Sequence, residues 1–70
     1  MGFSVGDSVK WNWGDGEGSG EIAERFTNDV SRMIEGTEVT RNASSSSPAF
    51  LIKQSDGSNV LKSCTELKAA

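Results

Sequence analysis

The chain has 70 residues, of which 34% are hydrophobic and 24% are charged, the composition of an ordinary globular domain. Seven basic and ten acidic residues give a net charge of −3, which weighs against nonspecific nucleic-acid binding, because that activity normally uses a basic excess. The single cysteine excludes an intrachain disulfide and favours a cytoplasmic location. We expect one domain over residues 1–70, with its core at about 3–68 and no membrane partner, since no apolar run could span a bilayer.

The first predicted strand has alternating apolar residues. Val5, Val9, Trp11 and Trp13 share one parity and polar residues occupy the other, which is the pattern of a strand with one buried face. The two indoles fill the core, or one of them forms a wall of a binding groove, because so small a core does not easily enclose an indole.

Residues 14–20, GDGEGSG, alternate glycine with polar residues. A phosphate-binding loop needs Lys and then Ser or Thr after its last glycine, but Glu21 follows here and the segment itself is acidic. The spaced ligands of a calcium loop are also missing. We therefore predict a flexible hairpin connection whose glycines supply positive φ angles.

The second predicted strand covers residues 20–27. Ile22 and Phe26 lie on one parity with Glu24 between them, and a charge on the inward side suggests a β-bulge or a barrel rim. A short amphipathic helix is the alternative, which the flanking glycine disfavours.

A polar ribbon follows. Residues 30–34 and 37–42 surround Glu35-Gly36, a turn with glycine where a left-handed conformation is needed. Residues 42–47 are predicted to form a loop, and Pro48 restarts the chain in extended form.

The last third of the chain predicts a second hairpin. Strands at 50–53 and 59–63 flank the turn 55–58, whose Asp-Gly pair is a strong hairpin signal. Residues 64–67 are expected to form one helical turn whose final leucine plugs the end of a barrel. The tail 68–70 is predicted to be frayed.

Four segments together carry a resemblance: GDSVKWNWG, GTEVTRNAS, PAFLIKQSDG and VLKSCTEL. Over about residues 3–68 the chain resembles the hypervirulence-associated Tudor-like domain family. This resemblance implies an all-β, small SH3-like barrel of Tudor type with about five strands, to which the pattern above adds one ribbon and a short C-terminal helical turn. Phe50 stands where we expect tyrosine in relatives, and Cys64-Thr65 where we expect His-Ser.

The residue types disfavour catalysis. The chain has no histidine and no tyrosine, so the commonest general base is absent and Cys64 has no histidine to activate it. A zinc site needs more Cys and His than this chain has. We expect a non-catalytic protein without a metal or cofactor.

Small Tudor-like barrels typically bind peptides or nucleic acids along strand edges and aromatic grooves. The leading hypothesis is a small monomeric interaction module that binds a protein or peptide in a groove beside residues 36–50. The candidate ligand-binding residues are Trp11, Trp13, Thr40, Arg41, Asn42 and Phe50. For Arg41 and Asn42, fixing the loop after residue 42 is an alternative role.

Two other hypotheses remain open. Lys10, Lys53 and Lys62 lie on strands expected to be neighbours and could form a weak nucleic-acid-binding face, unless glutamates pair with them across strands. The domain could also serve only as a structural subunit surface, without a ligand.

Overall fold

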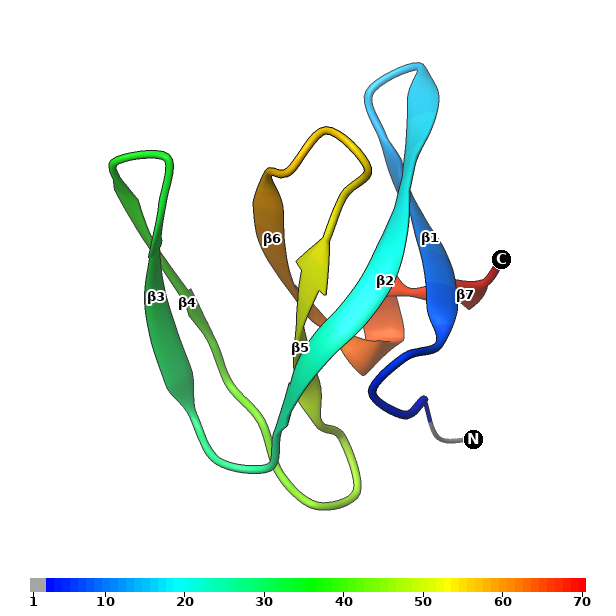
Figure 1. Ribbon diagram of the computed structural model, residues 1–70. Coiled ribbons are helices and arrows are strands. Elements are labelled where there is room, and N and C mark those ends of the chain that lie inside the picture. The colour runs from blue at the N-terminus through cyan, green and yellow to red at the C-terminus, as the bar shows by residue number, and fades with distance from the viewer. Residues whose placement is uncertain (1–2) are drawn as a thin grey trace.

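The structure, a computed structural model, describes residues 3–70 and every side chain in that range except that of Trp13. It is all-β, as predicted, with a five-stranded sheet and a separate two-stranded ribbon (Figure 1). Its elements are β1 (Ser8–Trp13), β2 (Gly16–Phe26), β3 (Val30–Ile34), β4 (Thr37–Arg41), β5 (Ala49–Lys53), β6 (Asn59–Ser63), the 3-10 turn η1 (Cys64–Glu66) and β7 (Lys68–Ala69).

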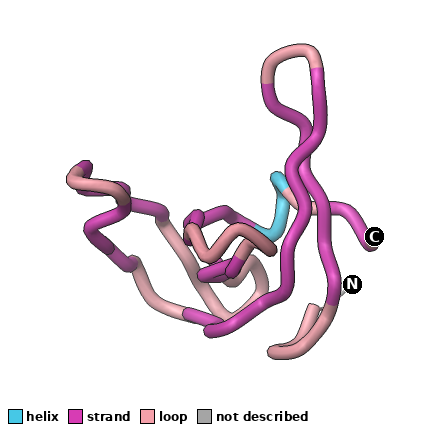
Figure 2. Tube along the Cα trace, turned by 45° about the horizontal axis from the view of Figure 1, so that its top comes forward, coloured by secondary structure: helices cyan, strands magenta, loops and turns pink. Residues whose placement is uncertain are grey.

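The sheet curls into a small barrel. Its strand order is β6-β5-β2-β1-β7, and every pairing is antiparallel. The chain passes from β6 through η1 directly to β7 at the opposite edge, so this short connection brings the two edges together. The hairpin of β1 and β2 rises beyond the rest of the barrel (Figure 2), and the C-terminal end of the chain lies beside β1.

The glycine-rich segment differs from the prediction. Only Gly14 and Asp15 form the turn, and β2 begins at Gly16. The glycines at 18 and 20 give close packing instead of positive φ angles. A Cβ at Gly18 would lie 2.5 Å from the indole of Trp11, and one at Gly20 would lie 2.6 Å from the backbone oxygen of Lys53. Glycine is therefore needed where β2 crosses the core.

The predicted bulge is present in β2. The register with β5 shifts between Ile22 and Glu24, so Ala23 is the extra residue. The shift keeps Ile22 buried and turns Glu24 to the exposed surface, which resolves the conflict that the inward-facing charge presented.

The main core lies on the concave face of the sheet. Its buried members are Val9, Trp11, Ile22, Phe50, Ile52 and Leu67, and the partly buried Phe3, Val60 and Cys64 pack against them. Leu67 follows η1 and closes the barrel end, as predicted. Val5 was expected on this buried face, but it is 61% exposed, because the chain turns at Gly6 (φ 96°) before β1 begins.

A second, smaller cluster joins the ribbon to the barrel. Val30, Ala49 and Leu61 are its buried members, with Phe26, Ile34, Val39 and Ala43 around them. The ribbon turn has Glu35 and Gly36 at positive φ (51° and 81°), as the hairpin prediction requires. β5 is therefore covered on both faces, one by the barrel core and the other by the ribbon.

The C-terminal tail is ordered, contrary to the prediction. Lys68 and Ala69 pair with Lys10 and Val9 of β1, and the backbone N–H of Ala70 donates to the carbonyl of Ser8 at 3.2 Å. Leu67 anchors this segment in the core and so brings the tail to the edge of β1, an arrangement that local sequence does not reveal.

Candidate functional site

The predicted aromatic groove does not form around Phe50. That ring is fully buried and packs edge-on against Phe3, with centroids 6.0 Å apart and an interplanar angle of 88°. Phe50 is therefore a core residue, because it lies on the inward parity of a strand covered on both faces. Trp11 is also in the core at 4% exposure, and the side chain of Trp13 lies outside the described residues.

The polar residues of the ribbon mainly contact one another and the barrel. The hydroxyl of Thr40 lies 2.9 Å from that of its cross-strand partner Ser31. Arg41 donates through Nη1 to the carbonyl of Thr40 at 3.0 Å and through Nε to Glu66. Asn42 is exposed beside a shallow hollow formed with residues of the following loop. These contacts favour a structural role for Arg41, although it contacts Thr40 and Glu66 and not the loop after residue 42.

Glu66 fastens the ribbon to the end of the barrel. Its Oε1 accepts hydrogen bonds from Arg41 Nε at 2.9 Å and from the backbone N–H of Ser63 at 2.8 Å. Lys62 Nζ lies 3.8 Å from Oε2. Partial burial raises the pKa of Glu66, but the Ser63 amide and the two cations outweigh it, so the pKa lies below its ordinary value of 4.5.

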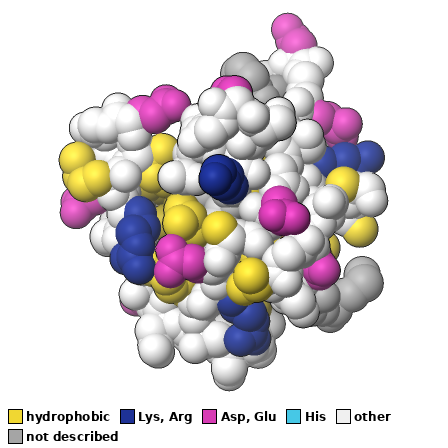
Figure 3. Space-filling model, in the orientation of Figure 1, with side chains coloured by type: hydrophobic (Ala, Val, Ile, Leu, Met, Phe, Trp, Pro, Cys, Tyr) yellow, Lys and Arg dark blue, Asp and Glu magenta, His cyan; other side chains and the backbone are white. Residues whose placement is uncertain are grey.

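The three predicted lysines do not form one basic face. β2 lies between β1 and β5, so the strands of Lys10 and Lys53 are not neighbours. Lys53 faces Glu21 in the β2–β5 register, whereas Lys62 lies on the core side of β6, with Nζ 6.0 Å from the centre of the Trp11 ring. Basic and acidic side chains also alternate over the face in Figure 3. The three lysines therefore do not line one continuous face of the sheet.

A groove beside the predicted loop has a more promising lining. It has a volume of about 540 Å³ and lies between the N-terminal segment, the end of β2 and the serine loop, residues 44–47. We call it the serine-loop groove. Its lining residues are Phe3, Ser4, Val5, Arg25, Ser45, Ser46 and Pro48.

The serine-loop groove offers apolar contact and hydrogen-bond donors but has no acidic lining. Val5, Ser45 and Ser46 are exposed, and Phe3 is half-buried. Arg25 is exposed and has no ion pair with the described residues. Ser45 and Ser46 line the same groove as Arg25, and the hydroxyl of Ser46 lies 3.2 Å from that of Ser44. A guanidinium and serine side chains on one groove are suited to bind a carboxylate or a carbonyl oxygen.

The serine loop is held in place by its own bonds and by Asp29. Ser44 and Ser47 exchange backbone hydrogen bonds at 3.1 and 3.2 Å, and the Ser44 hydroxyl accepts the Ser47 N–H at 3.1 Å. The carboxylate of Asp29 accepts the backbone N–H of Ala43 at 3.0 Å. Ser45 and Ser46 thus sit on a loop with a defined shape.

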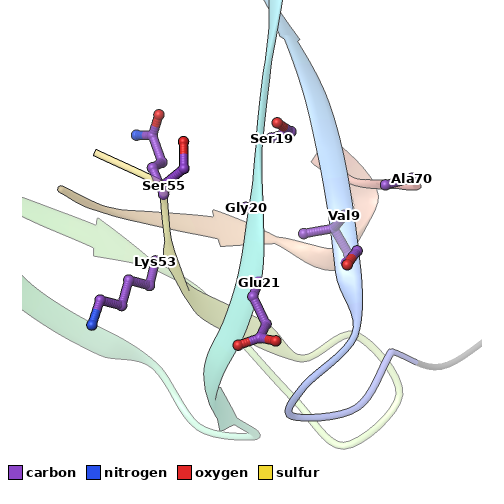
Figure 4. A pocket seen from close by; sticks show the side chains of 9 residues that line it. Val9, Ser19, Gly20, Glu21, Lys53, Ser55 and Ala70 are labelled. Atoms are coloured by element: carbon purple, nitrogen blue, oxygen red, sulfur yellow. The ribbon is translucent and has the colours of Figure 1, made fainter. Parts of the chain in front are cut away.

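A second hollow, of about 580 Å³, lies over the middle of β2 (Figure 4). In that view the charged ends of Lys53 and Glu21 point away from the hydroxyls of Ser19 and Ser55, so these polar groups do not converge. Glu21 is also the strand partner of Lys53, which reduces the attraction of this lysine for an anion. The serine-loop groove is therefore the better candidate site.

Sequence reasoning did not place Arg25 and Val5 beside the serine loop, nor Asp29 in holding that loop. Arg25 carried a signal, as a basic residue at the end of an otherwise acidic strand. Its neighbours in the groove come from distant parts of the chain, so only the fold brings them together.

The curled five-stranded antiparallel sheet with its added ribbon defines a small SH3-like barrel domain. More particularly, the chain belongs to the family described as hypervirulence associated proteins TUDOR domain, whose sequence profile matches residues 6–67. The expected family resemblance is thereby confirmed. Searches among curated proteins and among solved structures found no match.

Membership of this family indicates a small interaction module, since Tudor-like domains are generally non-catalytic binding modules. Among residues 3–70, no helix is long and apolar enough to cross a bilayer. Within the same residues, no three His, Cys, Asp or Glu side chains gather closely enough to hold a metal ion.

Proposed function

We propose that this domain is a monomeric, non-catalytic interaction module that binds a protein or peptide segment in the serine-loop groove. The observation that carries this proposal is that one groove is lined by the exposed Val5, by two serines and by Arg25, which has no ion pair within residues 3–70. A peptide offers the matching features, namely an apolar side chain, backbone carbonyls and a carboxylate.

The shape of the groove supports a peptide as the partner. It is open and shallow, and small-molecule sites usually enclose most of their ligand. A groove lined by a single arginine and a net charge of −3 also differ from the basic surfaces that bind nucleic acids. The lone Cys64 supports placing this module in the cytoplasm.

Non-catalytic binding is consistent with the chemistry around Cys64. Its sulfur lies 3.4 Å from the hydroxyl of Ser47, and no histidine exists in the chain to accept a proton. A thiol without a base is a weak nucleophile at neutral pH.

The test is an NMR titration of the ¹⁵N-labelled domain with pools of short peptides and, separately, with short DNA and RNA. We expect peptides to shift the amides of Val5, Arg25, Ser45 and Ser46. Nucleic acid should give at most weak, salt-sensitive shifts. Shifts only with nucleic acid, around the lysines, would reverse the proposal. Silence with every ligand would support a purely structural subunit surface.

A further inference from the structure

Part of β2 has an unpaired edge beside the serine-loop groove. β2 has 11 residues and β1 has six, and their pairing ends at Glu21 opposite Ser8. Ile22 makes the last backbone hydrogen bonds on that side, to Gly6 at 2.9 Å and Asp7 at 3.0 Å. Beyond it, Ala23 is the bulged residue, and residues 24–26 pair with β5 alone among the described residues (Figure 1).

The register indicates which backbone groups face this open edge. Ile22 uses its N–H and C=O toward Gly6 and Asp7, so its pair with Ile52 of β5 is a non-hydrogen-bonded pair. Alternation along β5 makes Phe50 the next residue of that kind, and its partner across the bulge is Arg25. The backbone N–H and C=O of Arg25 therefore point to the open edge.

The positively charged side chain of Arg25 favours a negatively charged partner. Arg25 lines the serine-loop groove, whereas Glu24 lies on the opposite face of β2. Asp7, on the N-terminal side, accepts the backbone N–H of Ser4 at 2.8 Å, and no carboxylate of the described residues forms an ion pair with Arg25. An acidic side chain placed opposite Arg25 would thus find a cation that has no ion-pair partner within residues 3–70.

We propose that an extended acidic peptide adds as a strand to the edge of β2 at residues 23–26. A carboxylate of this peptide pairs with Arg25, and a neighbouring apolar side chain packs on Val5. The inference rests on the proposed function, since it uses the same groove. Charged residues at a sheet edge also discourage indiscriminate pairing, so Arg25 would admit acidic strands and reject basic ones.

The test uses three libraries of peptides of about nine residues, roughly the length of one strand with its flanks. Their flanking residues are drawn from Val, Ile and Thr, and the libraries differ only in a central Glu, Gln or Lys. We expect the Glu library to bind about tenfold more tightly than the Lys library. It should also slow hydrogen exchange of the Arg25 amide by about tenfold or more, because that N–H becomes paired.

Charge reversal supplies the matched control. Arg25→Glu should lose the Glu library and gain the Lys library. Lys53→Glu reverses an exposed cation on the other face and should leave binding unchanged. Shifts at Ser45 and Ser46 without slower exchange at Arg25 would overturn strand addition and leave the proposed function standing. No shift with any library or peptide pool would overturn both, and concentration-dependent protection without peptide would identify a second copy as the occupant.

Discussion

The glycine at position 18 shows how one residue sets the packing of this small barrel. Its missing side chain lets the indole of Trp11 lie flat against β2, and that contact keeps a large ring only 4% exposed in a 70-residue chain. So small a core can therefore accommodate an indole, because the large side chain of Trp11 on β1 faces a glycine, Gly18, on the adjacent strand β2.

We predict that Gly18→Ala destabilises the domain by about 2 kcal/mol, as overpacking of a tight core typically does. The added methyl group would lie 2.5 Å from the ring of Trp11, so the indole or the strand must move. Gly16→Ala is the control, because nothing lies within 4 Å of its Cβ, and it should change stability by no more than about 0.5 kcal/mol. Urea unfolding measures both, and equal stabilities for the two variants would contradict this packing role.

The elements of the fold differ in how well the sequence predicts them. The turns at Glu35-Gly36 and Asp56-Gly57 follow from local chemistry, and the strands on either side agree with the structure. The start of β2 and the short β7 do not follow from local chemistry. Residues 16–20 are extended because Gly18 packs against Trp11 and Gly20 packs against β5. The strand β7 forms because the preceding Leu67 is buried in the core. Both causes are tertiary contacts.

The candidate site was predictable only in part, for a related reason. We predicted a groove beside residues 36–50, and the serine-loop groove borders that stretch through Ser45, Ser46 and Pro48, but none of the predicted ligand-binding residues whose side chains are described lines it. The partners of the serine loop in that groove, Val5 and Arg25, are brought to it by the turn at Gly6 and by the bulge at Ala23. The alternation in β2 predicted the bulge but not which residues it brings beside the serine loop, and the alternation before β1 placed Val5 in the core, because it does not show the turn at Gly6. Likewise, the pairing of Arg41 with Glu66 spans 25 residues and needs the closed barrel.

The ion pair between Glu66 and Arg41, which joins η1 to β4, should depend on pH. The pKa of Glu66 is lowered in the folded state, so its contribution to stability is present above its ordinary pKa of 4.5 and is lost as the pH falls through the lower folded value. We predict that Glu66→Gln lowers stability by about 1 kcal/mol or less at neutral pH, since the carboxylate is partly exposed. The difference from the wild type should disappear in acid.

Urea denaturation at neutral and at acidic pH measures this difference. Glu38→Gln serves as the control, because Glu38 is an exposed carboxylate on β4 without an ion pair to the described residues. A Glu66→Gln penalty that persists unchanged below the folded pKa would show that the loss is steric and not electrostatic.

In the whole molecule, the barrel has the larger hydrophobic core, and the ribbon is attached to it through a smaller cluster. The five-stranded sheet surrounds the main core. Within residues 3–70, β3 and β4 pair only with each other, and they rest on the small cluster around Leu61. A two-stranded ribbon has little independent stability. The ribbon therefore depends on that cluster and on the Arg41–Glu66 ion pair.

We predict that the ribbon opens before the barrel unfolds. In native-state hydrogen exchange, amides of residues 31–33 and 38–40 should be about tenfold or more less protected than those of Ile22 and Ile52, because opening the ribbon exposes only the smaller cluster. Arg41→Ala should widen this difference by removing the contact with Glu66, while leaving exchange in β2 and β5 nearly unchanged. Equal protection throughout the chain, with parallel losses in the variant, would mean instead that ribbon and barrel unfold as one cooperative unit.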